Sequence, residues 1–216
     1  MHLSKKGISA EVVAEQLRRF KTGFPFLKLE GAATTERGVL APTEQEIEEY
    51  LKEWDNYCAG DNDILKFVPA SGAASRMFKD LFSFLSADYD VPTNDFEKKF
   101  FENIEKFAFY ADLDAMCVKN NKLSIKELIE NGNYKGVVFN LLDFTGLNYG
   151  SLPKGLLKFH TYDCCSRTSA EEHFVEGALY AATDGVVKLH FTVSPNHKAL
   201  FEELVAERKA HYEAKF

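Results

Sequence analysis

From residue 64 onward, segments with the composition of β-strands alternate with segments of helical periodicity. Such alternation is typical of α/β proteins, in which crossover helices join parallel strands. We therefore expect an α/β fold with a mostly parallel sheet flanked by helices. The expected strands span residues 64–68, 137–142, 156–160 and 186–193, and the last shows the clearest alternation of apolar and polar side chains.

The segments outside this alternation show helical periodicity and are predicted to be helices. Ser9 is a candidate cap for a first helix, and Thr43 and Glu46 have the spacing of a capping box that opens a second. Residues 92–131 look helical throughout, with Ser124 as the candidate cap of a short helix at their end. In the segment that follows the first strand, Met77 is expected to face inward.

These patterns predict two parts. Residues 1–60 form an N-terminal helical extension, and residues 61–216 form the α/β domain with a helical insert at about 80–135. Nothing after the final helix resembles a closing strand, so the domain is expected to be incomplete at its C-terminus.

Composition limits the classes of partner. The 216 residues are 45% hydrophobic, enough for one sizeable core, and the formal net charge is −7. Because nucleic-acid binding rests on clustered Lys and Arg, a nucleic-acid partner is not expected. The four cysteines form no C-x-x-C pair, and no apolar run approaches the length of a membrane span or a signal peptide. We expect reduced thiols, no membrane association and a cytoplasmic location.

The most informative local stretch is FVPASGAASRMF, residues 67–78. Small residues between a strand and a helix let backbone N–H groups approach an anion, and the helix N-terminus adds a favourable dipole. The spacing matches neither the Walker loop nor the dinucleotide fingerprint, and small residues are also common in ordinary strand-to-helix turns. Both interpretations stay open for this stretch alone. The candidate phosphate-binding residues are Ala70, Ser71, Gly72, Ala73, Ala74, Ser75 and Arg76.

A second stretch places Lys154 between Pro153 and Gly155, ahead of a short apolar segment. The fixed backbone of such a turn can direct the ammonium group into a cleft. On its own, the stretch reads more simply as a surface turn lysine.

Together the two stretches resemble the signature of the sugar-phosphate nucleotidyltransferases, the nucleotide-diphosphosugar transferase superfamily. Gly72 matches a glycine of the family loop, Ser75-Arg76 matches its Thr-Arg pair, and Pro153-Lys154 matches its Pro-Lys element. Ser71 and Ala74 stand where the family has glycines. More closely, GLNYGSLPKGLLKFH, RTSAEEH and LHFTVSPNH resemble an uncharacterised bacterial family of the DUF4301 type, over nearly the whole chain.

The resemblance implies a function. A nucleoside triphosphate or nucleotide-sugar would bind the 70–76 loop, and a nucleotidyl group would pass to a sugar phosphate with the help of Mg²⁺. Arg76 and Lys154 would be the catalytic cations that stabilise charge on the phosphates. The aspartates that hold the metal in the superfamily come later than the point where this chain ends. The resemblance therefore implies an N-terminal fragment, and no metal ligand is assigned.

Two alternatives to this enzyme remain open. The first is a non-catalytic module that binds a nucleotide or sugar phosphate. A protein interaction through the Phe-rich insert ranks last, because such stretches are more often core. The oligomeric state is not predicted.

Three smaller features favour structural roles. Metal-ligand residue types gather in one segment without a zinc-site spacing, so no metal site is expected. They are His160, Asp163, Cys164, Cys165 and His173. Glu171 and Glu172 open a helix, where acidic residues favour the dipole, and His190 on a polar strand face suggests an edge strand.

Overall fold

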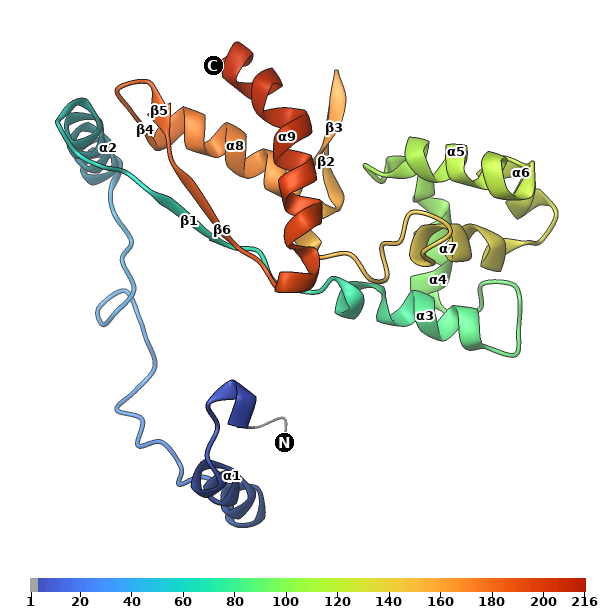
Figure 1. Ribbon diagram of the computed structural model, residues 1–216, viewed down its shortest axis with the longest axis horizontal. Coiled ribbons are helices and arrows are strands. Elements are labelled where there is room, and N and C mark those ends of the chain that lie inside the picture. The colour runs from blue at the N-terminus through green and yellow to red at the C-terminus, as the bar shows by residue number, and fades with distance from the viewer. Residues whose placement is uncertain (1–3) are drawn as a thin grey trace. The chain divides into compact units, whose positions relative to one another are not determined.

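The computed structural model describes residues 4–216, and Figure 1 shows their helices and strands. The chain divides into two compact units, Met1–Lys52 and Glu53–Phe216.

The first unit contains η1 (Ser4–Lys6), α1 (Ala10–Thr22) and the beginning of α2 (Glu44–Ala59). The Ser9 side chain accepts a hydrogen bond from the Val12 N–H at 3.3 Å, which confirms the predicted cap of α1. At α2, the Thr43 N–H donates to Oε2 of Glu46 at 2.8 Å, and the Glu46 N–H donates back to the Thr43 hydroxyl at 3.3 Å. The predicted capping box is therefore present as well.

In the second unit, the described strands form three two-stranded pairs. β1 (Lys66–Pro69) runs parallel to β6 (Leu189–Thr192), with Val68 opposite Phe191. The other two pairs are antiparallel: β2 (Lys158–Tyr162) with β3 (Cys165–Thr168), and β4 (Ala182–Thr183) with β5 (Val186–Val187). Since one pair of the described strands is parallel, the wider parallel sheet of a nucleotidyltransferase-like fold stays a prediction.

Helices make up most of the rest of this unit, and several gather around one core (Figure 1). The helices of that core are η2 (Ser75–Phe78), α3 (Lys79–Ser86), α4 (Asp95–Glu102), η3 (Ile104–Lys106), α5 (Tyr110–Asn121), α6 (Ile125–Glu130) and α7 (Tyr134–Leu142). A smaller core of Ala70, Ala170 and Phe201 lies next to β6 and joins α8 (Ser169–Tyr180) to α9 (Lys198–Lys215). Short turns η4 (Lys154–Leu156) and η5 (Pro195–His197) complete the unit.

The strand predicted at residues 137–142 is wrong, because this segment is the helix α7. Asn133 caps it by accepting from the Gly136 N–H at 2.9 Å. Val137, Val138 and Leu141 are all fully buried. A short run that is almost wholly apolar, here with Asn140 as its one polar residue, does not distinguish a buried strand from a buried helix.

Two other predicted segments are interrupted. Within residues 92–131, the predicted cap at Ser124 is confirmed, because its hydroxyl accepts from the Glu127 N–H at 3.2 Å at the start of α6. The helical pattern before it is divided, since η3 follows α4 and Lys122 ends α5 with a left-handed φ of 62°. The predicted strand 186–193 divides at Lys188 into β5 and β6. Its first part turns back on β4 through Asp184 and Gly185, whose φ values of 49° and 71° suit a tight hairpin turn.

Candidate functional site

The two stretches singled out in the sequence lie side by side. The Lys154 N–H donates to the Gly72 carbonyl oxygen at 3.0 Å, and Ala73 forms a bridge with Pro153. Ala74, which is 1% exposed, anchors the small-residue loop in the helical core. The loop and the Pro-Lys turn are therefore held together by backbone contacts and by burial.

They border a cavity of about 720 Å³ at the carboxyl end of β1, which we call the β1 cleft. Ligands of open α/β proteins bind beyond the carboxyl ends of strands. Besides β1 and the small-residue loop, the walls come from η2, η4, β2, α8 and β6. The lining residues are Val68, Pro69, Ala70, Gly72, Met77, Lys154, Gly155, Phe159, His160, Tyr162, Ser169, Ala170, Glu172, His173, Glu176 and Phe191.

Hydrogen-bond donors at this cleft are unused. Within residues 4–216, the Lys154 ammonium has neither an acidic partner nor a hydrogen bond, and the N–H groups of Ser71, Gly72 and Ala73 donate to no acceptor. An added Cβ at Gly72 would meet nothing within 4 Å. The loop thus offers its backbone to solvent beside a free cation.

Arg76 lies elsewhere. It lines a neighbouring depression of about 650 Å³ together with Ser75 and Lys79, while Met77 lines the β1 cleft. The segment begins with the tighter 3₁₀ turn η2, which moves Phe78 inward and leaves Met77 46% exposed. The inward orientation predicted for Met77 is therefore wrong. Of the two predicted catalytic cations, the structure brings Lys154, and not Arg76, into the cleft with Gly72.

One wall of the cleft holds a charged cluster. Oε2 of Glu176 contacts the Lys66 ammonium, and it lies 2.9 Å from Nδ1 of His173. The Tyr180 hydroxyl donates to the same oxygen at 3.1 Å. The hydrogen bond from Lys66 is the main reason that the pKa of Glu176 falls to about 2. This fixed carboxylate orients the His173 ring within the cleft wall.

A second carboxylate of the cleft, Glu172, is also engaged. The Tyr162 hydroxyl donates to its Oε2 at 3.0 Å, and Nε of Arg167 lies 3.0 Å from its Oε1. The Arg167 contact has the distance of an ion pair without the angles of a hydrogen bond, so Oε1 has no hydrogen-bond partner among the described residues. The Arg167 guanidinium stacks 3.8 Å from the centre of the Tyr162 ring, and the two side chains support each other.

Comparison with known proteins shows the family. The family model described as "Domain of unknown function (DUF4301)" matches residues 1–216. The chain belongs to the DUF4301 family. No curated protein and no solved structure matches it.

Sequence patterns did not predict that Tyr162, Glu172 and Glu176 line a cleft of this DUF4301 domain. The acidic residues that open α8 were expected to serve the helix dipole. Glu171 does cap that helix, through its contacts with Thr168. A sequence signal existed for Glu172 and Glu176. With His173 they have the spacing of residues near one face of a helix.

The described residues do not fit the Mg²⁺ that the resemblance implies. They contain no group of three or more His, Cys, Asp or Glu side chains arranged to hold a metal ion. Both carboxylates of the β1 cleft are already engaged by cationic and phenolic side chains. No step of a reaction is therefore assigned to a metal. In addition, none of the helices between residues 4 and 216 is long and apolar enough to cross a membrane.

Proposed function

We propose that the β1 cleft binds a phosphorylated small molecule, either a nucleotide or a sugar phosphate. One observation carries this proposal: an unpaired lysine, Lys154, is hydrogen-bonded through its own backbone to a loop with three unused N–H donors. Phosphate oxygens accept such N–H groups, and an ammonium group supplies the opposite charge.

The charge balance of the cleft also favours this ligand. Lys154 is the only Lys or Arg among its lining residues, and the nearby Lys66 and Arg167 are occupied by Glu176 and Glu172. An anionic group therefore has one preferred position, at the junction of the Pro-Lys turn and the small-residue loop.

The part of the wall formed by β2 suits the rest of the ligand. β2 contributes the rings of Phe159, His160 and Tyr162. Aromatic faces pack against nucleobases and against the apolar faces of sugars. A cleft of this volume lies within the range that accommodates such a molecule.

The test is a thermal-shift titration with ATP, UTP and glucose 1-phosphate, with glucose as the uncharged control. We expect at least one phosphorylated compound to raise the melting temperature, and Lys154→Ala to weaken its binding about tenfold or more, as loss of a charged hydrogen bond does. Lys98→Ala is the matched control, because Lys98 is an exposed lysine of α4 outside the cleft. Equal shifts in Lys154→Ala and wild type would refute the proposal.

A second candidate function is nucleotidyl transfer to a sugar phosphate. The contact between the glycine loop and Pro153-Lys154 favours it, because the resembled superfamily uses these two elements together. In this role Lys154 would stabilise charge on the phosphates, and Arg76 would act from the neighbouring depression. Continuous pyrophosphate release from nucleoside triphosphates and sugar phosphates, assayed with MgCl₂, would support it. Binding without such release would leave the domain as a binding module.

A further inference from the structure

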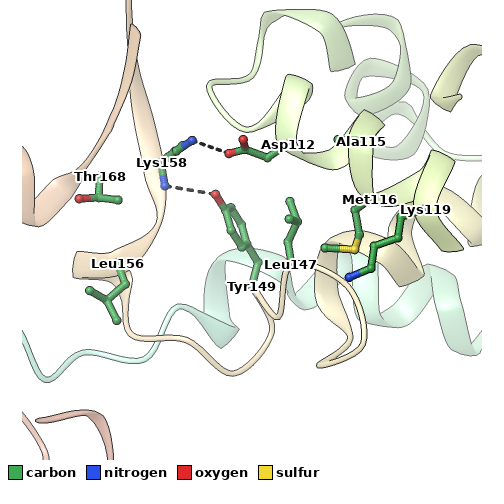
Figure 2. Close-up of a pocket in the computed structure, with 9 residues that line it drawn as sticks. All are labelled: Asp112, Ala115, Met116, Lys119, Leu147, Tyr149, Leu156, Lys158 and Thr168. Atoms are coloured by element: carbon green, nitrogen blue, oxygen red, sulfur yellow. Dashed lines mark hydrogen bonds and ion pairs between the residues drawn. The ribbon is translucent and has the colours of Figure 1, made fainter. Parts of the chain in front are cut away.

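A second cavity, of about 450 Å³, lies between α5 and the segment that leads into β2 (Figure 2). We call it the α5 cavity. It shares no lining residue with the β1 cleft. Its lining residues are Asp112, Ala115, Met116, Lys119, Leu147, Tyr149, Leu156, Lys158 and Thr168.

One end of this cavity presents a hydrogen-bond donor. The Tyr149 hydroxyl oxygen accepts from the Lys158 N–H at 3.2 Å, and its own hydrogen is used by no acceptor within residues 4–216. Tyr149 is only 6% exposed, and burial raises its pKa to about 12, so the phenol stays protonated. The Tyr149 hydroxyl hydrogen is therefore available to an acceptor atom of a ligand.

An acceptor lies close to this donor. Oδ2 of Asp112 receives a hydrogen bond from the Lys158 ammonium at 2.6 Å. In Figure 2 the Tyr149 hydroxyl and this ion pair occupy the same part of the cavity. A hydroxyl group on a ligand would therefore find a donor in Tyr149 and an acceptor in Asp112.

The other end carries a positive charge. The Lys119 ammonium has no acidic partner in the part of the chain that the structure describes. Figure 2 shows it next to Met116, on the side of Leu147 away from the ion pair. The side chains between the two ends are apolar, and a methionine sulfur packs well against aromatic rings.

We propose that the α5 cavity binds a small hydroxylated aromatic carboxylate. The carboxylate meets Lys119, the ring lies between Met116 and Leu147, and the hydroxyl accepts from Tyr149. A mostly apolar cavity with a few polar groups at fixed positions is the usual form of a small-molecule site. This assignment is independent of the function proposed for the β1 cleft.

The test uses 4-hydroxybenzoate as the probe and NMR of methyl-labelled methionine as the readout. The chain has three methionines; Met116 lines the α5 cavity and Met77 lines the β1 cleft. We expect a saturable shift of the Met116 methyl signal and none of Met77. Absence of a saturable Met116 shift would overturn the proposal.

Two truncated probes and two variants separate the contacts. Lys119→Met should weaken 4-hydroxybenzoate about tenfold and leave phenol unaffected, because phenol lacks the carboxylate. Tyr149→Phe keeps the ring, and it should weaken 4-hydroxybenzoate and leave benzoate unaffected. Lys98→Met is the control for loss of a surface charge. If both Lys119→Met and Tyr149→Phe bind 4-hydroxybenzoate like wild type while retaining the wild-type Met77 signal, the assignment is wrong.

Discussion

Lys154 and Glu176 represent two kinds of charged residue at the cleft. Lys154 is free, whereas Glu176 is held by Lys66, His173 and Tyr180. The sequence pointed to Lys154, because a lysine between Pro and Gly has a recognisable backbone setting. Glu176 gave no such signal, because its role depends on Lys66, which comes from a strand far away in the sequence. Single residues are therefore predictable where local backbone chemistry marks them, and much less so where partners arrive through the fold.

The pair of Lys66 and Glu176 predicts a dependence of stability on pH. The pKa of Glu176 is lowered from 4.5 to about 2, so the folded state favours the carboxylate. This contribution to the free energy of unfolding is present above pH 4.5 and is lost as the pH falls toward 2. Lys66→Met should therefore destabilise the protein most above pH 4.5, and its difference from wild type should shrink below that.

Urea unfolding between neutral and acidic pH measures this difference. Lys98→Met, which removes a lysine that forms no ion pair within residues 4–216, should show no change of its own across the same window. A Lys66→Met difference that stays constant from neutral pH to pH 2 would contradict the pairing.

Among the elements, α8 is the one that connects the cleft to the strands. The helix supplies Glu172, His173 and Glu176 to the cleft. Gly177 lets it approach β5 and β6 closely. A Cβ at Gly177 would lie 2.7 Å from Cγ1 of Val187 and 2.9 Å from Cδ2 of Leu189. The absence of a side chain at Gly177 sets how near the helix lies to β5 and β6.

Gly177→Ala should therefore destabilise the second unit by about 1–3 kcal/mol, as overpacking does. Gly72→Ala is the matched control, because its Cβ would meet no atom within 4 Å and should leave the free energy of unfolding nearly unchanged. Denaturant unfolding of both variants gives the comparison. Equal stabilities would show that α8 does not pack on the strands as described.

The elements also show how far periodicity carries. Helices with side-chain caps, such as α1 and α2, begin where the sequence predicted, because the capping residues act locally. The segment 137–142 was misread, since a short run with one polar residue, Asn140, shows no clear period. The turn at Asp184-Gly185 was also missed, although an Asp-Gly pair is a strong hairpin signal in itself.

At the scale of the molecule, the helices from η2 to α7 share one core, and the β1 cleft borders the separate, smaller core through Ala70 and Ala170. The sequence predicted that the chain mixes strands with a helical insert. It also predicted that residues 70–76 and Lys154 belong together, and backbone contacts between Gly72 and Lys154 agree with that. The 3₁₀ turn η2, four residues long, places Arg76 at the neighbouring depression and not at the β1 cleft. The amino-acid composition of a segment does not show whether its first turn is a 3₁₀ turn or an α-helical turn.

The central claim is that the β1 cleft binds a phosphorylated ligand through Lys154. The most direct measurement is NMR of the methyl-labelled full chain titrated with nucleoside triphosphates and glucose 1-phosphate, because Met77 and Met116 report on the two cavities separately. We predict a saturable shift of the Met77 signal that needs about tenfold more ligand, or more, in Lys154→Ala and that leaves the Met116 signal in place. A Met77 signal that no phosphorylated compound moves, or one that moves equally in Lys154→Ala, would contradict the claim.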